Sequence, residues 1–350
     1  MKNLPNAHKT GRNVYLDLFK FLLAFMVICI HLVGETYSIF PLYRLAVPSF
    51  FLISGYFAYN TNMEQAKKKA PAFVWRCAKY MLIGIGFYTA YEFVSYLIDG
   101  TNIGWFFTTI FYEGDAPLFH FFLLNAPIPY YTVGAQIWFL IALFVVSILH
   151  YLLVKFNKTK WYKIIVPISF AIYFFFSGFM YIIQPSTDIP IRYMRNAWFF
   201  GLPCFGLGYL TAQIQWHKKS WYKYVYLVLA LAFFFLQLGE HALIARENHN
   251  LEMYISGVLS AVFFLQFFLG LKKTDCKFYY DWIGKSAYFY VYILHMGVAV
   301  TLSKFVSFSN LYIKSLMVLL ISFAIYEICF LLGKLIKNIR KKHALQTNKE

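Results

Sequence analysis

Ten stretches of this chain are apolar and close to twenty residues long, and this feature most limits how the chain can fold. An α-helix of about 20 apolar residues crosses the hydrocarbon core of a bilayer. Within lipid, only helices and closed barrels satisfy every backbone polar group. We therefore predict one transmembrane helix for each stretch. Their approximate bounds are 14–33, 41–59, 77–98, 136–154, 163–183, 196–215, 221–238, 253–271, 284–303 and 312–333.

The composition agrees with a lipid environment. Hydrophobic residues make up 60% of the chain and charged residues 13%, whereas a soluble domain carries roughly 25% charge. So few polar side chains could not cover the surface of a soluble fold of this size. The predicted fold class is all-α, a polytopic membrane bundle with a single domain over 1–343 and a short polar tail over 344–350. No small-residue cleavage site follows the run 14–33, which predicts a retained helix.

The positive charges alternate between the segments that separate the apolar runs. One set of segments contains 25 Lys and Arg residues and the other set 6, with Lys20 inside the first run. Because the basic side of a membrane protein faces the cytoplasm, both termini are predicted to be cytoplasmic. The net charge of +17 is then explained by topology, and no nucleic-acid partner is expected. The predicted location is the cell membrane, where the chain contacts lipids.

The longest connection between runs spans residues 99–135 and is rich in aromatic residues. Two interpretations remain open, an amphipathic helix or lid at the interface and a loop with aromatic anchors. The five cysteines show neither metal-ligand spacing nor a disulfide framework, so no metal site is predicted.

Ionisable residues within the apolar runs are the first candidates for function. Each costs roughly 2.5–3.5 kcal/mol on insertion scales, so its presence needs a reason. Roles in helix pairing account equally well for the three that lie beyond the second run. The set is Asp17, Lys20, His31, Glu92, His295 and Glu327.

The first apolar run carries a polar stripe. Lys20 and His31 are eleven residues apart, which places them on one helix face and about 16 Å apart along the axis. Asp17 precedes Lys20 by three residues and can pair with it, while Glu35 follows His31 by four and can orient its imidazole. The structural alternatives are an interfacial ion pair with a snorkelling Lys20 and a hydrogen-bonded packing histidine.

Four motifs resemble those of the acyltransferase family 3 of membrane proteins, which includes O-acetyltransferases of O-antigen, peptidoglycan and Nod factors. The first is the basic residue and histidine, Lys20 and His31, where the family often has Arg in place of Lys. The second reads Arg-Leu-Ala-Val-Pro-Ser-Phe-Phe-Leu-Ile-Ser-Gly-Tyr-Phe over 44–57. The others are Gln-Ile-Trp-Phe-Leu over 136–140 and Ile-Gly-Lys-Ser-Ala-Tyr over 283–288, followed by Tyr292 and His295.

The resemblance implies an enzyme that moves an acyl group, expected to be acetyl, from cytoplasmic acyl-CoA to a hydroxyl of an extracytoplasmic glycan or glycolipid. Acyl-CoA would be a co-substrate, with no bound cofactor. His31 would act as general base or transiently carry the acyl group. The implied assignments are His31 and Glu35 for catalysis, Lys20 and Asp17 for the donor, Arg44, Ser54 and Tyr56 for the acceptor or an oxyanion, and Glu92 and His295 in support.

Two further functions remain open. The family also resembles the membrane domain of membrane-bound serine racemases, so a carrier for a small, serine-like amino acid would use the same polar stripe. A non-catalytic accessory protein of polysaccharide biosynthesis is the other alternative. The sequence contains no G-x-S-x-G, H-E-x-x-H, Walker A or G-x-G-x-x-G motif.

Overall fold

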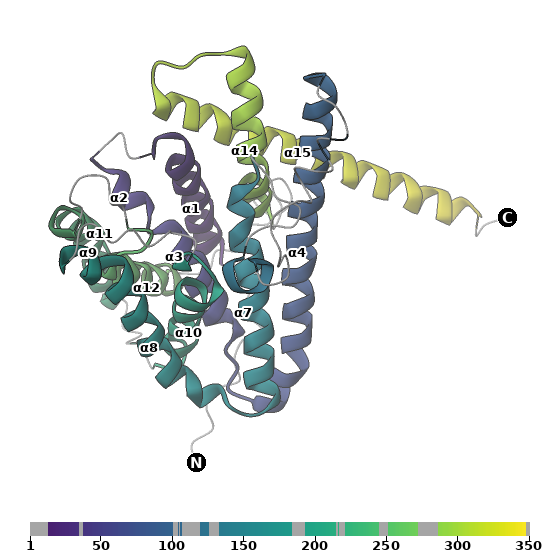
Figure 1. Ribbon diagram of the computed structural model, residues 1–350. Helices are drawn as coiled ribbons and strands as arrows, with labels where there is room; N and C mark the ends of the chain where they lie inside the picture. Colours follow the sequence, from purple (N-terminus) through teal and green to yellow (C-terminus); the bar gives the residue numbers. More distant parts are fainter. Residues whose placement is uncertain are drawn as a thin grey trace.

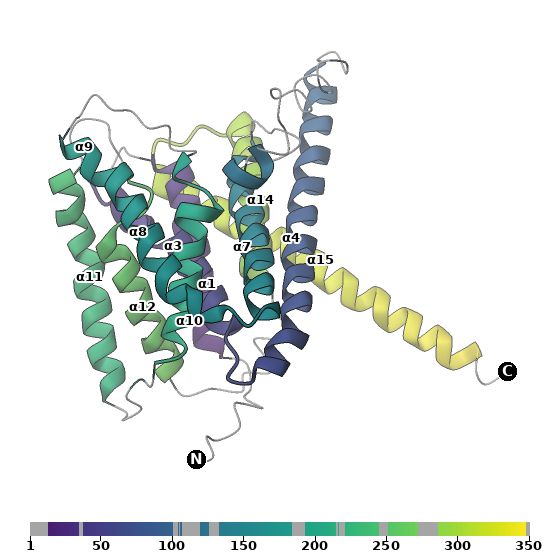
Figure 2. The same ribbon diagram turned by 60° about the horizontal axis from the view of Figure 1, so that its bottom comes forward.

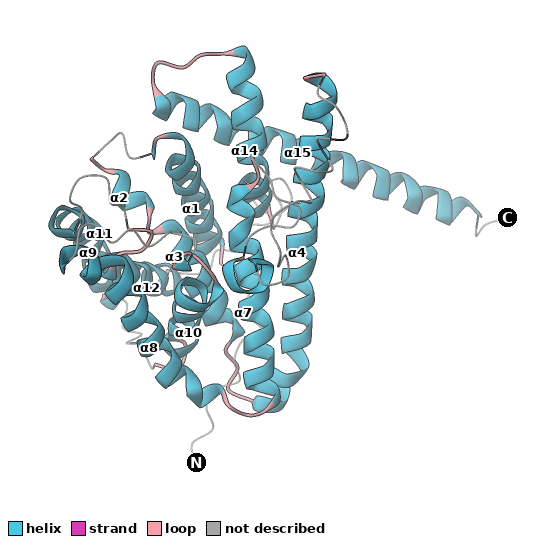
Figure 3. Cartoon of the chain, in the orientation of Figure 1, coloured by secondary structure: helices cyan, strands magenta, loops and turns pink. Residues whose placement is uncertain are grey.

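The computed structural model describes residues 13–34, 38–100, 104, 106, 120–125, 133–183, 193–214, 216, 221–244, 251–271 and 286–347. Within these residues all regular secondary structure is helical and no strand occurs (Figure 3). The α-helices are α1 (Val14–Leu32), α2 (Phe40–Tyr43), α3 (Ala46–Ala58), α4 (Met63–Ile98), α7 (Trp138–Lys155), α8 (Tyr162–Phe174), α9 (Met180–Ile183), α10 (Leu202–Thr211), α11 (Tyr222–Ile244), α12 (Ile255–Gly270), α14 (Ala287–Phe305) and α15 (Leu311–Thr347). Short 3-10 or π turns are η2 (His120–Leu124), η3 (Ala135–Ile137), η4 (Thr159–Trp161), η5 (Phe175–Phe179) and η7 (Ala197–Gly201).

Every predicted apolar run contains helix in its described residues, so the all-α fold class is confirmed. Six helical segments are long and apolar enough to cross a bilayer by themselves. The count of ten crossings and the orientation remain predictions. The six segments are Val14–Leu32, Met63–Ile98, Ala135–Lys155, Thr159–Phe179, Tyr222–Ile244 and Leu311–Arg340.

Two of the differences between the helices and the predicted runs have a clear local reason. The run 41–59 divides into α2 and α3, because the chain turns at Arg44, whose backbone N–H donates to the carbonyl of Pro41 at 3.1 Å. Helix α4 begins well before its apolar part. Its N-cap is Asn62, whose side chain accepts a hydrogen bond from the backbone N–H of Gln65.

The helices form one bundle in which α1 is central. Figure 2 shows α11, α12 and α8 on one side of α1 and α3, and α4, α7 and α14 on the other. Helix α1 packs against α3, α12, α14 and α15, and Leu23, Ala24 and Ile28 on it are completely buried. The C-terminal half of α15 leaves the bundle (Figure 1).

Helices α3 and α10 approach each other through two glycines. A Cβ atom on Gly55 would lie 1.8 Å from the carbonyl oxygen of Phe205, and one on Gly208 would lie 2.0 Å from that of Leu52. Only glycine fits at either position. Small residues that let backbones touch are typical of helix pairs in membranes, where packing has to replace the hydrophobic effect.

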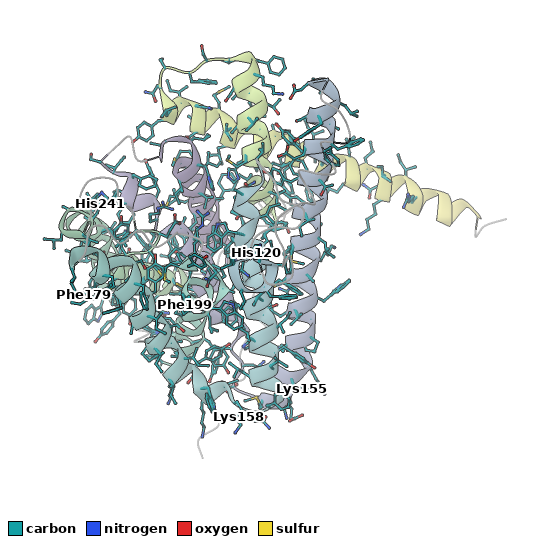
Figure 4. The ribbon with its side chains drawn as sticks, in the orientation of Figure 1. His120, Lys155, Lys158, Phe179, Phe199 and His241 are labelled. Carbon is teal, nitrogen blue, oxygen red and sulfur yellow. The ribbon has the colours of Figure 1, made fainter. Side chains whose placement is uncertain are left out.

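Several contacts gather the basic segments at one end of the bundle, which we call the basic end. Asn13, before α1, donates to the carbonyl of Phe268 near the end of α12 at 2.8 Å. Ala66 and Ala70 in the first turns of α4 pack against Val154 at the end of α7. Figure 4 shows Lys155 and Lys158 together at this end. The contacts thus agree with the alternation of charge along the sequence.

Other contacts hold the helices together at the opposite end of the bundle. Lys304 at the end of α14 lies 3.1 Å from Asp99, which follows α4. The turn η2, which includes His120 (labelled in Figure 4), packs against η7 and α7. Asn125, which directly follows η2, accepts a hydrogen bond from the backbone N–H of Ala197 in η7 and so joins these two turns. Most of the connection 99–135 lies outside the described residues, so both interpretations of it remain open.

Candidate functional site

Lys20 and Asp17 form the predicted ion pair, with Lys20 Nζ 3.4 Å from Asp17 Oδ1. The ammonium group also lies over the rings of Tyr288 at 5.2 Å and Phe57 at 5.9 Å. Such cation–π contacts stabilise a cation away from water. The side chain of Lys20 is 15% exposed and that of Asp17 is 3% exposed. Lys20 is therefore held among helices α1, α3 and α14, in the half of α1 nearer the basic end.

His31 lies beside a second histidine, His295 of α14, with the two ring centroids 5.4 Å apart and the rings tilted by 34°. His295 is completely buried, and its Nδ1 lies 2.6 Å from the carbonyl oxygen of Tyr292. A carbonyl only accepts, so Nδ1 carries the proton and Nε2 presents a lone pair. Among the described residues, Nε2 has no hydrogen-bond partner. A buried proton acceptor therefore lies next to His31.

A buried hydrogen-bond network fixes the part of α14 that carries His295. The hydroxyl of Tyr292 donates to the carbonyl of Gln136 at 2.5 Å, and the side-chain amide of Gln136 donates to the hydroxyl of Tyr88. Tyr88 in turn donates to the carbonyl of Ile293 at 2.7 Å. Because these bonds join α4, η3 and α14 away from water, they hold the imidazole of His295 in place.

Towards the opposite end, Arg44 takes part in a group that we call the Arg–Glu–Arg cluster, formed by Arg44, Glu252 and Arg195. Arg44 Nη1 lies 2.6 Å from Glu252 Oε2, and Arg195 Nη1 lies 3.6 Å from Glu252 Oε1. The Cζ atom of Arg195 lies 5.5 Å from the ring centre of Trp138. Both guanidinium groups are within electrostatic range of His31. The structure thus brings two predicted site residues, His31 and Arg44, into one region.

Other predicted site residues lie elsewhere. Ser54 donates its hydroxyl to the carbonyl of Phe50 within α3 at 2.8 Å. Tyr56 adjoins Phe57, whose ring faces Lys20, so it lies towards Lys20 rather than towards Arg44. Glu92 accepts a hydrogen bond from the backbone N–H of Val133 at 3.0 Å and so anchors the segment before η3.

The structure does not place two further candidate residues, Glu35 and Glu327, in this region. Glu35 lies outside the described residues. Glu327 is on α15, where its Oε1 has no hydrogen-bond partner. In the part of the chain that the structure describes, no cluster of three His, Cys, Asp or Glu side chains could hold a metal ion.

Sequence reasoning gave no role to Arg195 and Glu252, because each is a charge at the edge of an apolar run and looks like an ordinary loop residue. One signal was available for Arg195. It is among only 6 basic residues on the sparsely charged side of the chain. A basic residue on that side has no topological reason to be there, and this points to a specific partner.

A family model described as an acyltransferase domain matches residues 13–334. The match begins just before α1 and ends within α15, so it includes Lys20, His31, His295 and the Arg–Glu–Arg cluster. Comparison with curated proteins and with solved structures gives no match.

Proposed function

The chain belongs to acyltransferase family 3 and is a membrane acyltransferase, and from this premise we propose that it transfers an acetyl or similar acyl group from cytoplasmic acyl-CoA to a hydroxyl of an extracytoplasmic glycan or glycolipid. The observation that carries the proposal is the polar stripe of α1. At one end of the stripe, the ammonium of Lys20 lies over the ring of Tyr288. At the other end, His31 lies beside His295. The stripe therefore places one polar group in each half of the bundle, with the buried apolar residues Ala24, Val27 and Ile28 between them.

The donor approaches from the basic end. Lys68 and Lys69 at the start of α4, which are exposed, and the half-buried Lys67 attract the phosphates of acyl-CoA. Lys20 then holds a donor phosphate inside the bundle, where an unpaired anion would be costly. It holds the thioester carbonyl only before the thioester reaches His31, since the two residues are about 16 Å apart along α1. Its ion pair with Asp17 keeps the ammonium compensated while no donor is bound.

The transfer is a substitution at the acyl carbon, in which a C–O bond forms to the acceptor and the C–S bond to CoA breaks. His31 takes the proton of the attacking hydroxyl and returns it to the CoA sulfur, so no oxidant or reductant is needed. In the second route, His31 carries the acyl group on nitrogen before the hydroxyl attacks. Arg44 would stabilise the negative oxygen of the tetrahedral intermediate or bind an anionic acceptor.

His295 supports the base. An in-plane N–H···N hydrogen bond of about 3 Å between two imidazoles places their centres about 5 Å apart, close to the observed 5.4 Å. A small turn of the His31 ring allows its N–H to bond to His295 Nε2. The other nitrogen of His31 is then fixed as the acceptor for the hydroxyl proton.

The experiment that tests this function is mass spectrometry of surface glycans from cells with and without the gene. We expect an acyl group that depends on the gene. Purified protein should also bind acetyl-CoA. Binding of radiolabelled serine without binding of acetyl-CoA would instead favour the amino-acid carrier, and unchanged glycans with neither ligand bound would favour a non-catalytic accessory role.

A further inference from the structure

We propose that the Arg–Glu–Arg cluster binds an oxyanion group, a carboxylate or a phosphate, of the acceptor, and that the enzyme therefore acylates negatively charged glycans or glycolipids. The inference rests on the proposed function, since it assumes that an acceptor reaches His31. It adds the substrate class and gives roles to Arg195 and Glu252.

The first observation is the charge of the cluster. Two guanidinium groups share a single carboxylate, that of Glu252. Among the described residues, the other carboxylate close to the cluster is that of Glu240, which accepts hydrogen bonds from the backbone N–H groups of Ile255 and Ser256 at 2.8 and 2.9 Å and from the hydroxyl of Ser256. The carboxylate of Glu240 is therefore occupied by hydrogen bonds from residues at the start of α12. Counted over the described residues, the cluster therefore holds two positive charges and one negative charge.

The second observation is that the two arginines have unused donors. Arg44 is 9% exposed, and its Nε–H has no hydrogen-bond partner among the residues that the structure describes. A buried donor without a partner is unfavourable, and native structures rarely leave one. Arg195 approaches Glu252 only to 3.6 Å, which is too long for a hydrogen bond. An incoming oxyanion would supply acceptors for both groups.

The third observation is that Arg195 is both accessible and oriented. Its side chain is 30% exposed, whereas those of Arg44 and Glu252 are nearly buried. Its guanidinium lies over the ring of Trp138, whose own position is fixed by packing against Phe51 and Phe200. A guanidinium held on an aromatic face presents its planar edge to a ligand, and this edge matches the geometry of carboxylate and phosphate.

The location of the cluster distinguishes an acceptor anion from the phosphates of CoA. The cluster joins the turn after α2 to the residues before α12 and η7. The end of α12 lies at the basic end, so the cluster, which precedes the start of α12, lies towards the opposite end, at the His31 end of α1 rather than at the Lys20 end. Donor phosphates that enter at the basic end would meet Lys20 first. The anion in reach of Arg195 is therefore on the other substrate.

The test combines identification of the product with a pair of variants. Mass spectrometry of the glycans from cells with the gene should show that the acylated unit carries a carboxylate or a phosphate. In cells that express Arg195→Gln at matched levels, we expect at least a tenfold loss of acylated product. Arg195→Lys keeps the charge but loses the planar edge, and should retain between a third and a tenth of the product.

Two controls separate loss of acceptor binding from a general effect of removing a positive charge and from loss of donor binding. Arg340→Gln removes the same charge from the exposed end of α15 and should leave acylation within twofold of the wild type. The affinity of purified Arg195→Gln for acetyl-CoA should also stay within twofold.

A neutral acylated unit, normal acylation by Arg195→Gln, or weakened acetyl-CoA binding by that variant would each overturn the proposal. The last outcome would assign the cluster to the donor phosphates. Failure of the proposed function itself is recognised separately, because the wild-type gene would then add no acyl group at all.

Discussion

The imidazole rings of His31 and His295 lie 5.4 Å apart, centre to centre, although they belong to α1 and α14. One of the two, His295, has its tautomer set by the carbonyl of Tyr292, and this leaves a lone pair on Nε2 without a partner. The pair therefore consists of one imidazole with a fixed protonation pattern and one that is only partly buried. This asymmetry gives the two histidines different expected phenotypes.

Replacing His31 by Ala or Gln should abolish acyl transfer while the protein remains inserted and folded. Loss of a general base costs about 10²–10⁴-fold in rate, and loss of a covalent carrier should cost more. Stability should change little or improve, because a polar group leaves the apolar part of a helix. The measurement is the acyl content of surface glycans at matched expression. Near-normal acylation would reject His31 as the catalytic residue.

His295→Ala should be milder than His31→Ala, and the choice of substituent separates positioning from packing. His295→Gln can place an oxygen acceptor near the position of Nε2, so it should retain more activity than His295→Leu. Leu should lose roughly 10²-fold, as expected for a misplaced reacting group. If packing alone mattered, Leu would be the better substitute, since it needs no partner. His150→Gln is the control, a buried histidine bonded to Tyr162 and remote from His31, and should leave transfer unchanged.

Lys20→Ala should weaken binding of acetyl-CoA, whereas Lys20→Arg should retain much of it because the charge remains. A hydrogen bond to a charged group contributes about 1.5–3 kcal/mol, so the Kd should rise roughly 10- to 100-fold. Titration of purified protein measures this. The Ala variant also leaves Asp17 unpaired, so the double variant Asp17→Asn, Lys20→Met serves as a neutral control. If that folded variant binds acetyl-CoA normally, Lys20 does not contact the donor.

Gly55→Ala and Gly208→Ala should each destabilise the protein by roughly 1–3 kcal/mol, because the added methyl group would overlap a backbone oxygen of the facing helix. Gly239 on α11 is the matched control, since a Cβ there meets nothing within 4 Å. Gly239→Ala should be neutral or up to about 1 kcal/mol stabilising through helix propensity. Thermal unfolding in detergent compares the three variants. Equal melting temperatures would show that α3 and α10 are not in backbone contact.

The topology predicts opposite labelling of segments on the two sides of the membrane in a variant without native cysteines. A cysteine at a site within 61–75 or 217–220 should be protected from an impermeant reagent in intact cells and react after the membrane is opened. A cysteine in place of Ser307, between α14 and α15, should react in intact cells. Labelling in the reverse pattern would show that the orientation of the bundle is the opposite of the predicted one. Labelling of segments from both sides in intact cells would show that the predicted number of crossings is wrong.

The apolar runs are enough to predict the helices, because in lipid the length of a run nearly determines what it forms. The pairing of Asp17 with Lys20 is equally local, since residues three apart on a helix are neighbours. The pattern of apolar residues does not predict the split of the run 41–59, because apolar residues continue on both sides of Arg44. The turn depends instead on the hydrogen bond from the backbone N–H of Arg44 to the carbonyl of Pro41.

Contacts between distant helices could not be predicted in this way. The proximity of His31 to His295 depends on how α1 packs on α14, and helical periodicity gives the face of a residue without naming the helix opposite it. The bond between Arg44 and Glu252 links two segments far apart in the sequence. The family motifs included Arg44, Gln136, Tyr292 and His295, but their order along the chain does not show which of them meet.

The glycine contact between α3 and α10 also limits how the enzyme can move. Two helices whose backbones touch at both Gly55 and Gly208 cannot slide or tilt independently, because any relative shift would force main-chain atoms together. They therefore behave as a single rigid body. Any rearrangement that passes an acyl group from the Lys20 half of the bundle to the His31 half has to take place around this pair, through displacement of the helices that pack beside it.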